Sequence, residues 1–349
     1  MGGSMTPTRW IWMDGEWVRW DEARIHVLSH VVHYGSSVFE GLRCYPTLEG
    51  PAIFRLRDHV RRLFRSCRIY RMEPNVTQEE VADAISEVIE RNDLEAAYIR
   101  PVVYRGYEVL GIDPRSCPIR IAVAAWPWGR YLGEDSATAG VDIKVSSWRR
   151  LAPDTLPAMA KAGANYMNSQ LMKMDAIEDG YAEAVALDIE GFVSEGSGEN
   201  IFVVLDDVLY TPPWDSSVLI GITRDSVMTL ASDLGIEVKE RRIPRELLYV
   251  ADEIFLCGTA AEITPVRSVD HVQLGVTMPG PITGLIERAF DDLVHGRVED
   301  RRGWLHHVSD QRARRAAIAR AGAALRLDPS LDGVLRSDAD IVSLTTGAT

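Results

Sequence analysis

Only four of the 38 lysines and arginines in this 349-residue chain are lysines, so chemistry that needs an amine nucleophile has four candidates. A lysine attacks an aldehyde in its neutral form, and removal from water favours that form. Lys161 fits this requirement best, because small residues surround it in residues 157–166 and the six residues before it include no acid. On composition alone, an ordinary surface lysine beside a glycine loop remains the alternative.

The other three lysines have ordinary surroundings. Residues 141–145 and 236–240 alternate between apolar and polar, so each predicts a strand whose lysine, Lys144 or Lys239, shares the polar face with an acid. Lys173 lies in a helical stretch near two acidic residues, which is typical of a solvated lysine. None of these patterns indicates a reactive amine.

Three further segments have the residue types of a ligand site. Glycines in residues 191–200 permit a close backbone approach to a flat ligand, and Glu195 among them could hold a proton on a ring nitrogen. Residues 221–225 begin a predicted helix capped by Thr223, whose free N–H groups suit an anion such as a phosphate. Small residues in 257–264 follow an apolar strand. Each segment alone is more often an ordinary turn or N-cap, so only their combination indicates a ligand site.

The elements that must position these residues follow from hydrophobic periodicity. Strands and helices mix on both sides of a break at 129–140, which predicts two α+β domains. The predicted elements are a hairpin over 9–20 turning at Asp14-Gly15, a helix over 77–91 with a Thr77–Glu80 capping box, strands at 97–104 and 119–126, a hairpin of 201–205 with 208–210, a helix from Thr223 to Gly235 and a helix from Pro281 to Gly296.

Composition argues against several classes of protein. A hydrophobic content of 46% can fill a large core, and no apolar run has the length of a membrane span. The net charge of -13, with no basic stripe before the C-terminal tail, argues against nucleic acid as a partner. The four cysteines lack CxxC spacing and the histidines lack an HExxH motif, so we expect no metal site. Together with the absence of a leader-like start, this cysteine usage predicts a cytoplasmic protein.

Taken together, these segments resemble the class IV, or fold-type IV, pyridoxal-phosphate-dependent aminotransferases, and most of all the bacterial branched-chain amino acid aminotransferases. The resemblance implies an α+β fold with a smaller N-terminal α/β domain (9–132), a linker (133–140) and a larger cofactor-binding domain (141–308) with a mixed, barrel-like sheet. Residues 1–8 and 309–349 would be tails, the second helical and then disordered. The matching segments keep the family's order from about residue 9 to about residue 307 and are residues 33–43, 98–101, 161–166, 194–200, 221–225 and 258–266.

The same resemblance implies a cofactor, pyridoxal 5'-phosphate, and a role for each matching residue. Lys161 would hold the cofactor as a Schiff base and carry the Cα proton of the substrate. Glu195 would pair with the pyridine nitrogen and Tyr166 with the phenolic oxygen. The phosphate would be bound by Arg62, Ile222, Thr223 and Thr259.

The implied reaction moves the amino group of L-leucine, L-isoleucine or L-valine to 2-oxoglutarate with ping-pong kinetics. Strand alternation places Tyr98 and Arg100 on one face, where a hydroxyl and a cation can bind a carboxylate. In similar enzymes Arg100, Tyr34 and Tyr131 would bind the distal carboxylate of glutamate. The α-carboxylate would be bound by Tyr98, Thr259 and Ala260, and the apolar side chain by Phe39 and Trp128, for which a plain core role is the alternative.

Residues 105–111 depart from the family, because they are bulkier than the usual Gly-rich loop. In the family this loop covers the pocket of a neighbouring subunit, so the resemblance implies at least a homodimer, and sequence alone does not distinguish a dimer from a hexamer. Three alternatives share the scaffold: a D-amino acid or (R)-amine transaminase, an aminodeoxychorismate-type lyase and a non-catalytic relative. Arg100 and residues 258–262 argue against the first, the Tyr98–Arg100 pair argues against the second, and the complete set of residues argues against the third.

Overall fold

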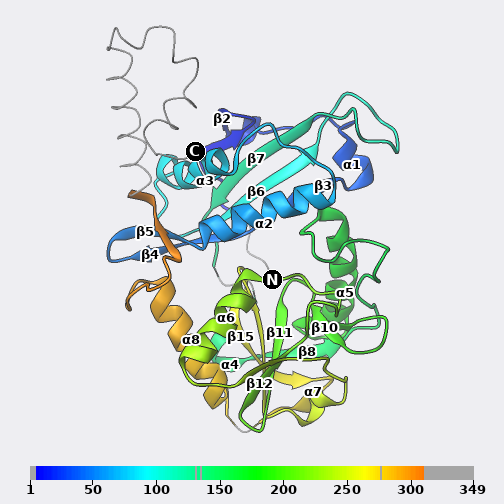
Figure 1. Ribbon diagram of the computed structural model, residues 1–349, viewed down its shortest axis with the longest axis vertical. Helices are drawn as coiled ribbons and strands as arrows, with labels where there is room; N and C mark the ends of the chain where they lie inside the picture. The colour runs from blue at the N-terminus through cyan, green and yellow to red at the C-terminus, as the bar shows by residue number, and fades with distance from the viewer. Residues whose placement is uncertain (1–4, 130–131, 134–135, 276, 310–349) are drawn as a thin grey trace, which may run out of the picture.

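The computed structural model describes residues 5–129, 132–133, 136–275 and 277–309. Its strands form two sheets, one built mainly from the first part of the chain and one from the second, and the two lie one above the other in Figure 1. This arrangement agrees with the expected α+β fold, in which the second sheet curls into a half-barrel.

The first sheet is antiparallel throughout, and its strand order is β17-β5-β4-β6-β7-β1-β2, with β3 paired to β6. The predicted N-terminal hairpin is confirmed, since Asp14 and Gly15 have φ of 50° and 95° between the first two strands. The strands are β1 (Trp10–Met13), β2 (Glu16–Arg19), β3 (Ser37–Phe39), β4 (Leu42–Thr47), β5 (Gly50–Phe54), β6 (Ala97–Arg105), β7 (Ile119–Trp126) and β17 (Leu305–His307).

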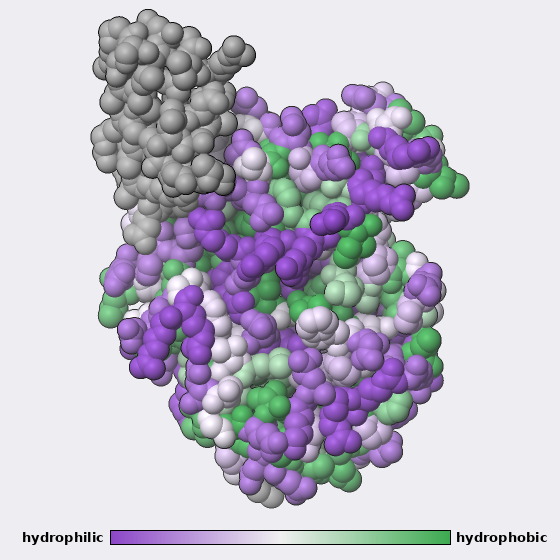
Figure 2. Space-filling view, viewed as in Figure 1, coloured by the Kyte–Doolittle hydropathy of each residue, from purple (hydrophilic) through white to green (hydrophobic). Residues whose placement is uncertain are grey.

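Two long helices, α2 (Leu56–Ile69) and α3 (Gln78–Arg91), contact each other and cover the first sheet. The predicted capping box is confirmed, because Thr77 accepts the Glu80 N–H and the Glu80 carboxylate accepts the Thr77 N–H. The outer face of α2 carries four exposed arginines and contributes to the hydrophilic band that crosses the middle of Figure 2. The short helices here are η1 (Trp20–Glu22) and α1 (His30–Tyr34).

The second sheet is mixed, with strand order β10-β9-β8-β15-β14-β11-β12-β13 and β16 paired to β15. The pairs β8–β9, β8–β15 and β12–β13 are parallel. Strands β9, β11 and β14 are buried at every residue except the last, because helices or the other half of the chain cover both faces. The strands are β8 (Val141–Val145), β9 (Glu183–Leu187), β10 (Val193–Gly196), β11 (Asn200–Leu205), β12 (Val208–Thr211), β13 (Val238–Glu240), β14 (Glu253–Gly258), β15 (Glu262–Val269) and β16 (Val272–Gln273).

The helices of the second half confirm one prediction and correct another. Pro281 is the first residue of α8 and Gly296, at φ 65°, follows its end, as expected. Thr223 is not the cap of α6: Gly221 is the N-cap, and Thr223 lies inside the first turn with its side chain buried. The helix begins before Thr223 because Gly221 takes the extended conformation that a cap requires. The helices are α4 (Ser136–Ala139), η2 (Gly163–Asn165), α5 (Tyr166–Glu178), α6 (Ile222–Asp233), α7 (Leu247–Val250) and α8 (Pro281–Val294).

After α8 the chain returns to the first sheet, where β17 pairs with β5. The sequence places these residues in the expected domain 141–308, and the division of the chain into domains stays a prediction. The predicted tail from residue 310 onward lies outside the described residues. Among the described helices, none combines the length and apolarity of a membrane span.

Candidate active site

A cavity of about 220 Å³ is lined by residues from both halves of the chain. The lining includes the strand that carries Tyr98 and Arg100, the segment around Lys161, the glycine loop after β10 and the first turn of α6. Twelve of the fourteen residues proposed from the sequence line it, namely Phe39, Arg62, Tyr98, Arg100, Trp128, Lys161, Tyr166, Glu195, Ile222, Thr223, Thr259 and Ala260.

Lys161 lies on an extended segment just before η2 and α5. Its Nζ donates to Tyr166 Oη at 2.6 Å and lies 5.2 Å from the centroid of the Phe39 ring. The backbone is fixed on both sides, since Lys161 N–H donates to Ser66 Oγ at 3.1 Å and Lys161 C=O accepts the Phe39 N–H at 2.9 Å. In the described part of the chain no carboxylate forms an ion pair with this amine. The amine is therefore held in place by a neutral phenol and remains available for chemistry.

The other lysines are engaged elsewhere. Lys144 pairs with Asp179, and Lys239 pairs with Glu237 at 2.8 Å, as expected for lysines on polar strand faces. Lys173 is not a solvated lysine: it donates to Ala182 C=O at 2.6 Å and pairs with the buried Glu183 at 2.8 Å. The helical pattern did not reveal this contact because Glu183 lies on the neighbouring strand β9.

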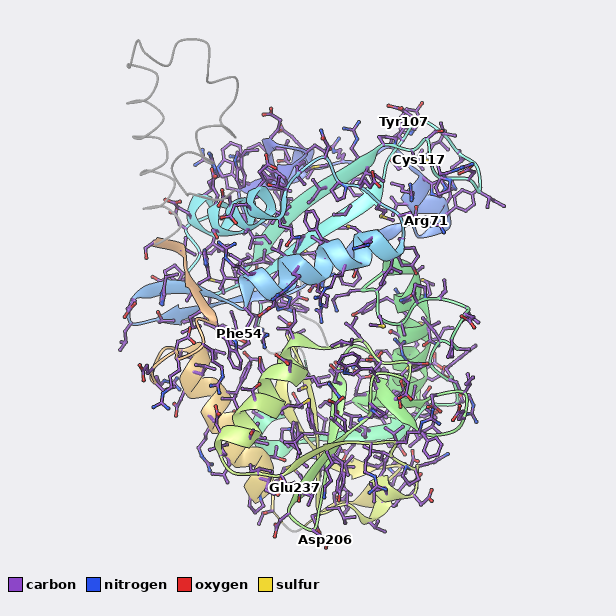
Figure 3. The ribbon with its side chains drawn as sticks, viewed as in Figure 1. Phe54, Arg71, Tyr107, Cys117, Asp206 and Glu237 are labelled. Carbon is purple, nitrogen blue, oxygen red and sulfur yellow. The ribbon has the colours of Figure 1, made fainter. Side chains whose placement is uncertain are left out.

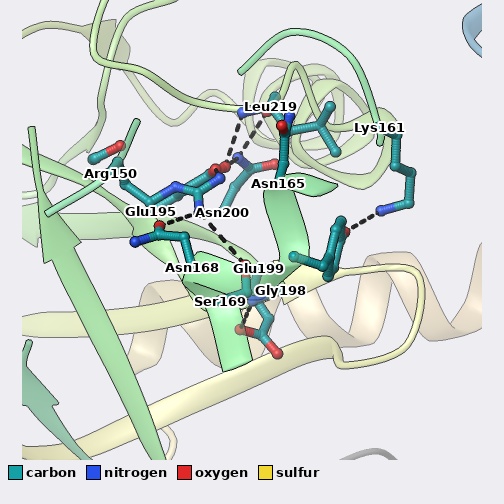
Figure 4. A network of polar contacts seen from close by, with 12 residues as sticks. Arg150, Lys161, Asn165, Asn168, Ser169, Glu195, Gly198, Glu199, Asn200 and Leu219 are labelled. Atoms are coloured by element: carbon teal, nitrogen blue, oxygen red, sulfur yellow. Dashed lines mark hydrogen bonds and ion pairs between the residues drawn. The ribbon is translucent and has the colours of Figure 1, made fainter. Parts of the chain in front are cut away.

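Glu195 is buried at the cavity wall and accepts three hydrogen bonds, which Figure 4 shows together. Arg150 Nη2 donates to Oε1 at 2.7 Å, while Leu219 N–H and Asn200 Nδ2 donate to Oε2 at 2.9 and 3.2 Å. Burial raises the pKa of Glu195, and Arg150 opposes the rise by stabilising the anion. The result is a fixed carboxylate that is a stronger base than an exposed one.

The anion end of the cavity combines α6 with Arg62. The first backbone N–H groups of a helix have no intrahelical acceptors, and Ile222 and Thr223, the first two residues of α6, line the cavity. Arg62 Nη1 donates to Ile220 C=O at 2.9 Å, so the guanidinium is tied to the segment that leads into this helix.

Arg62 is itself oriented by a buried carboxylate that the sequence analysis did not identify. Its Nε and Nη2 donate to the two oxygens of Glu40 at 2.6 and 2.8 Å, and His59 Nδ1 lies 2.8 Å from the same carboxylate. Burial alone would raise the pKa of Glu40, but Arg62 and His59 hold this pKa well below its usual range. Glu40 is therefore an anion wherever the protein is folded at neutral pH.

The opposite wall is aromatic and cationic. Tyr98 and Arg100 lie on one face of β6, as alternation predicts, and Arg100 Nη2 donates to Tyr98 Oη at 3.1 Å. Arg100 also lies over the Phe39 ring, with Cζ 4.6 Å from its centroid, and Trp128 meets Tyr98 edge to face at 4.5 Å. Arg100 Nε is buried with no hydrogen-bond partner among the described residues, which leaves a donor for a carboxylate ligand.

Thr259 and Ala260 form the tight connection between β14 and β15. Arg43 binds their carbonyls through Nε at 2.9 Å and Nη2 at 3.0 Å, and it also binds Gly129 C=O at 2.9 Å. Two glycines keep the cavity open: a Cβ on Gly41 would overlap Tyr98 Oη, and a Cβ on Gly221 would overlap the Asn200 side chain.

Two proposed residues are not brought to this cavity. Tyr34 lies in α1, is 47% exposed and is absent from the cavity lining, while Tyr131 lies outside the described residues. Tyr107, in the bulky loop after β6, is also half exposed at the outer end of the molecule (Figure 3). No group of three potential metal-ligating side chains occurs among the residues that the structure describes.

Comparisons with known proteins give a consistent result. The model of the amino-transferase class IV family matches residues 37–269. The branched-chain-amino-acid aminotransferase of Escherichia coli K12 is 50% identical over 301 residues, which cover 86% of this chain and 97% of that protein. A crystal structure of the Escherichia coli enzyme superimposes with a TM-score of 0.85, covering 86% of this chain and 99% of that one at 50% identity. The Thermobaculum terrenum branched-chain amino acid aminotransferase in its PLP form gives a TM-score of 0.81 at 36% identity, with the same coverage.

Proposed function

Because the chain belongs to the class IV amino-transferases, we propose that it is a branched-chain amino acid aminotransferase. It transfers the amino group of L-leucine, L-isoleucine or L-valine to 2-oxoglutarate and yields the branched 2-oxo acid and L-glutamate. The observation that carries the proposal is a single cavity in which Lys161 Nζ lies 2.6 Å from Tyr166 Oη. The chain that forms this cavity is 50% identical over 301 residues to a branched-chain-amino-acid aminotransferase.

The cofactor is pyridoxal 5'-phosphate, and the cavity fits it. A helix N-terminus with an oriented arginine suits the phosphate, and Glu195 suits a protonated ring nitrogen. Gly41 and Gly221 line the same cavity at positions where a side chain would overlap Tyr98 or Asn200. When bound, this cofactor supplies an aldehyde that takes up the amino group and a ring that accepts the electrons left when the Cα proton departs.

Within this site, each protein group has a proposed task. Arg62 offers the phosphate the N–H groups that Glu40 and Ile220 do not use, and Ile222, Thr223 and Thr259 bind the phosphate with it. Glu195 holds a proton at the ring nitrogen, because its raised pKa makes it a strong acceptor there. Tyr166 Oη accepts a hydrogen bond from Lys161 Nζ and so fixes the direction of the amine.

Lys161 is the proposed base. Its amine would take the Cα proton of the amino acid and deliver it to the cofactor carbon that carries the aldehyde, after which water would release the 2-oxo acid and leave the amino group on the cofactor. The second half of the reaction runs these steps in reverse with 2-oxoglutarate, so the two substrates bind in turn to the same groups.

Dual specificity requires one pocket for an apolar side chain and for a carboxylate. We propose that Phe39 and Trp128 contact the branched side chain, while Arg100 binds the distal carboxylate of glutamate. The stacking of Arg100 on Phe39 supports this role of Arg100, because the Phe39 ring can partner the guanidinium when leucine occupies the pocket. Tyr98, Thr259 and Ala260 are proposed to bind the α-carboxylate.

We also propose that the chain works as a homodimer at least. Support comes from the exposed Tyr34, and from Tyr107 and Leu110, which are about half exposed in the loop after β6 and could reach the pocket of a second copy. A cytoplasmic location is proposed as well, supported by four cysteines that are all unpaired thiols in the buried interior.

The purified protein, loaded with pyridoxal phosphate, is to be tested for 2-oxoglutarate-dependent loss of L-leucine, L-valine, D-alanine and an (R)-amine. We expect turnover of the two L-amino acids. Turnover of D-alanine or the amine alone would favour the transaminases of opposite selectivity, and pyruvate release from aminodeoxychorismate would favour the lyase.

The lysine assignment has its own test. Borohydride reduction should attach the cofactor covalently to the parent protein and to Lys144→Ala and Lys239→Ala, but not to Lys161→Ala. Attachment at another lysine in the parent protein, located by peptide mass spectrometry, contradicts the assignment.

A further inference from the structure

A second buried glutamate, Glu199, lies at the cavity wall four residues after Glu195. Glu199 is 4% exposed. Its carboxyl accepts the Gly198 N–H at 3.0 Å, a bond drawn in Figure 4. The tasks proposed above for the reaction do not use this carboxyl. Its electrostatic neighbours are Glu195, Glu183 on β9 and Lys173 on α5.

Each charged neighbour of Glu199 already has a partner of opposite sign. Glu195 pairs with Arg150 at 2.7 Å, and Glu183 pairs with Lys173 at 2.8 Å while also accepting the Ala184 N–H at 2.7 Å. Two anions and two cations therefore cancel in this buried cluster. An ionised Glu199 would add an unpaired negative charge, since no described cation lies within ion-pair distance of its carboxyl.

We propose that Glu199 is a positioning residue that remains a neutral carboxylic acid, so that Glu195 is the ionised partner of the cofactor ring nitrogen. This inference rests on the proposed function. Glu199 acts through Glu195 and does not touch the reacting atoms.

Burial and the nearby carboxylates favour the neutral form of Glu199, whereas the Gly198 N–H and the Lys173 cation favour the anion. Burial, followed by the charge of Glu183, raises the pKa of Glu199 to about 8, and the cation of Lys173 only partly offsets the rise. Cys257 on β14 adds no charge, because burial raises the pKa of its thiol. Arg150 is already engaged with Glu195.

Ionisation of Glu199 would change the site in a defined direction. A second negative charge beside Glu195 strengthens the attraction for a proton in this region, so it favours the protonated ring nitrogen. The colour of the bound cofactor reports its protonation. The parent protein should therefore show an absorbance step near pH 8 that Glu199→Gln, a permanently neutral isostere, lacks.

The direct test uses protein without cofactor, so that it does not depend on the proposed reaction. Infrared spectra of the parent protein should contain the C=O band of a protonated carboxylic acid at pH 6 to 7, which disappears as the pH rises through about 8. The band should be missing from Glu199→Gln and retained in Glu237→Gln, in which an exposed glutamate is replaced.

The possible outcomes separate the two proposals. A protein that transaminates L-leucine but has no titrating acid band refutes the role of Glu199. A protein with the band but no transaminase activity refutes the proposed function and keeps the neutral acid. If Glu199→Gln does not fold, the titrating band should persist in Glu195→Gln, because the neutral acid is then Glu199. Loss of the band in Glu195→Gln, or a parent without the band, contradicts the inference.

Discussion

Replacement of Glu40 by glutamine removes one negative charge from a fully buried site. Glu40 binds Arg62 through both carboxylate oxygens, at 2.6 and 2.8 Å, and also contacts His59 at 2.8 Å. A glutamine amide has only one acceptor oxygen, so its NH₂ group must face a donor of the guanidinium or of the imidazole. The variant leaves the Arg62 cation buried without its counter-charge.

Removal of one partner from a buried ion pair costs about 3–5 kcal/mol, and we expect Glu40→Gln to lower the free energy of unfolding by this amount. Urea denaturation of the cofactor-free protein at pH 7 measures the change. The matched control is Glu299→Gln, because Glu299 pairs with Arg301 at 3.1 Å while both side chains are more than three-quarters exposed. This control should change the same free energy by less than about 0.5 kcal/mol.

The pH dependence follows from the lowered pKa of Glu40. A carboxyl whose pKa is lower in the folded state contributes stability above its unfolded pKa, near 4.5, and this stability is lost as the pH falls. The difference between parent and Glu40→Gln should therefore be constant from pH 6 to 8 and shrink below about 4.5. A difference below about 1 kcal/mol at pH 7, or one that grows in acid, refutes this account of the Arg62 site.

Two further substitutions test the shape of the cavity. Gly41→Ala should raise the KM for amino acids, because the new methyl group displaces the hydroxyl of Tyr98, whereas Gly111→Ala, which meets nothing within 4 Å, should leave steady-state kinetics as in the parent. Trp128→Ala should lower kcat/KM for L-leucine by about tenfold or more, since one lost apolar group is worth about 1–3 kcal/mol. The loss of kcat/KM for L-glutamate should be smaller. An equal loss for both substrates contradicts the assignment of Trp128 to the apolar side chain.

Local patterns predicted the elements and the residues that lie on them. The hairpin at Asp14-Gly15, the capping box at Thr77 and the shared face of Tyr98 and Arg100 all depend on neighbours within a few positions, and all are confirmed. The cap at Thr223 was wrong by two residues, because Gly221 and Thr223 both satisfy the preferences for that position.

The charged partners that hold the site could not be predicted in the same way. Arg150 and Glu195 are separated by 45 residues, and Arg62 and Glu40 by 22, so neither pair has a periodic or spacing signal. Glu40 lies within the segment 33–43 that carried the family resemblance, and a carboxylate between Val38-Phe39 and Gly41-Leu42 was the one available signal. Lys173 was misread for the same reason, because its partner is on another strand.

The two buried ion pairs explain how the cavity can accept an anionic cofactor without a large net charge of its own. Arg62 has five N–H donors, of which Glu40 and Ile220 occupy three, so two remain for a phosphate. Because Glu40 cancels its charge, Arg62 can stay buried before any ligand binds, and its direction is already set. In the proposed site, phosphate binding would then depend on N–H groups of Arg62 and of the first turn of α6 that are already oriented, so little entropy would be lost on binding.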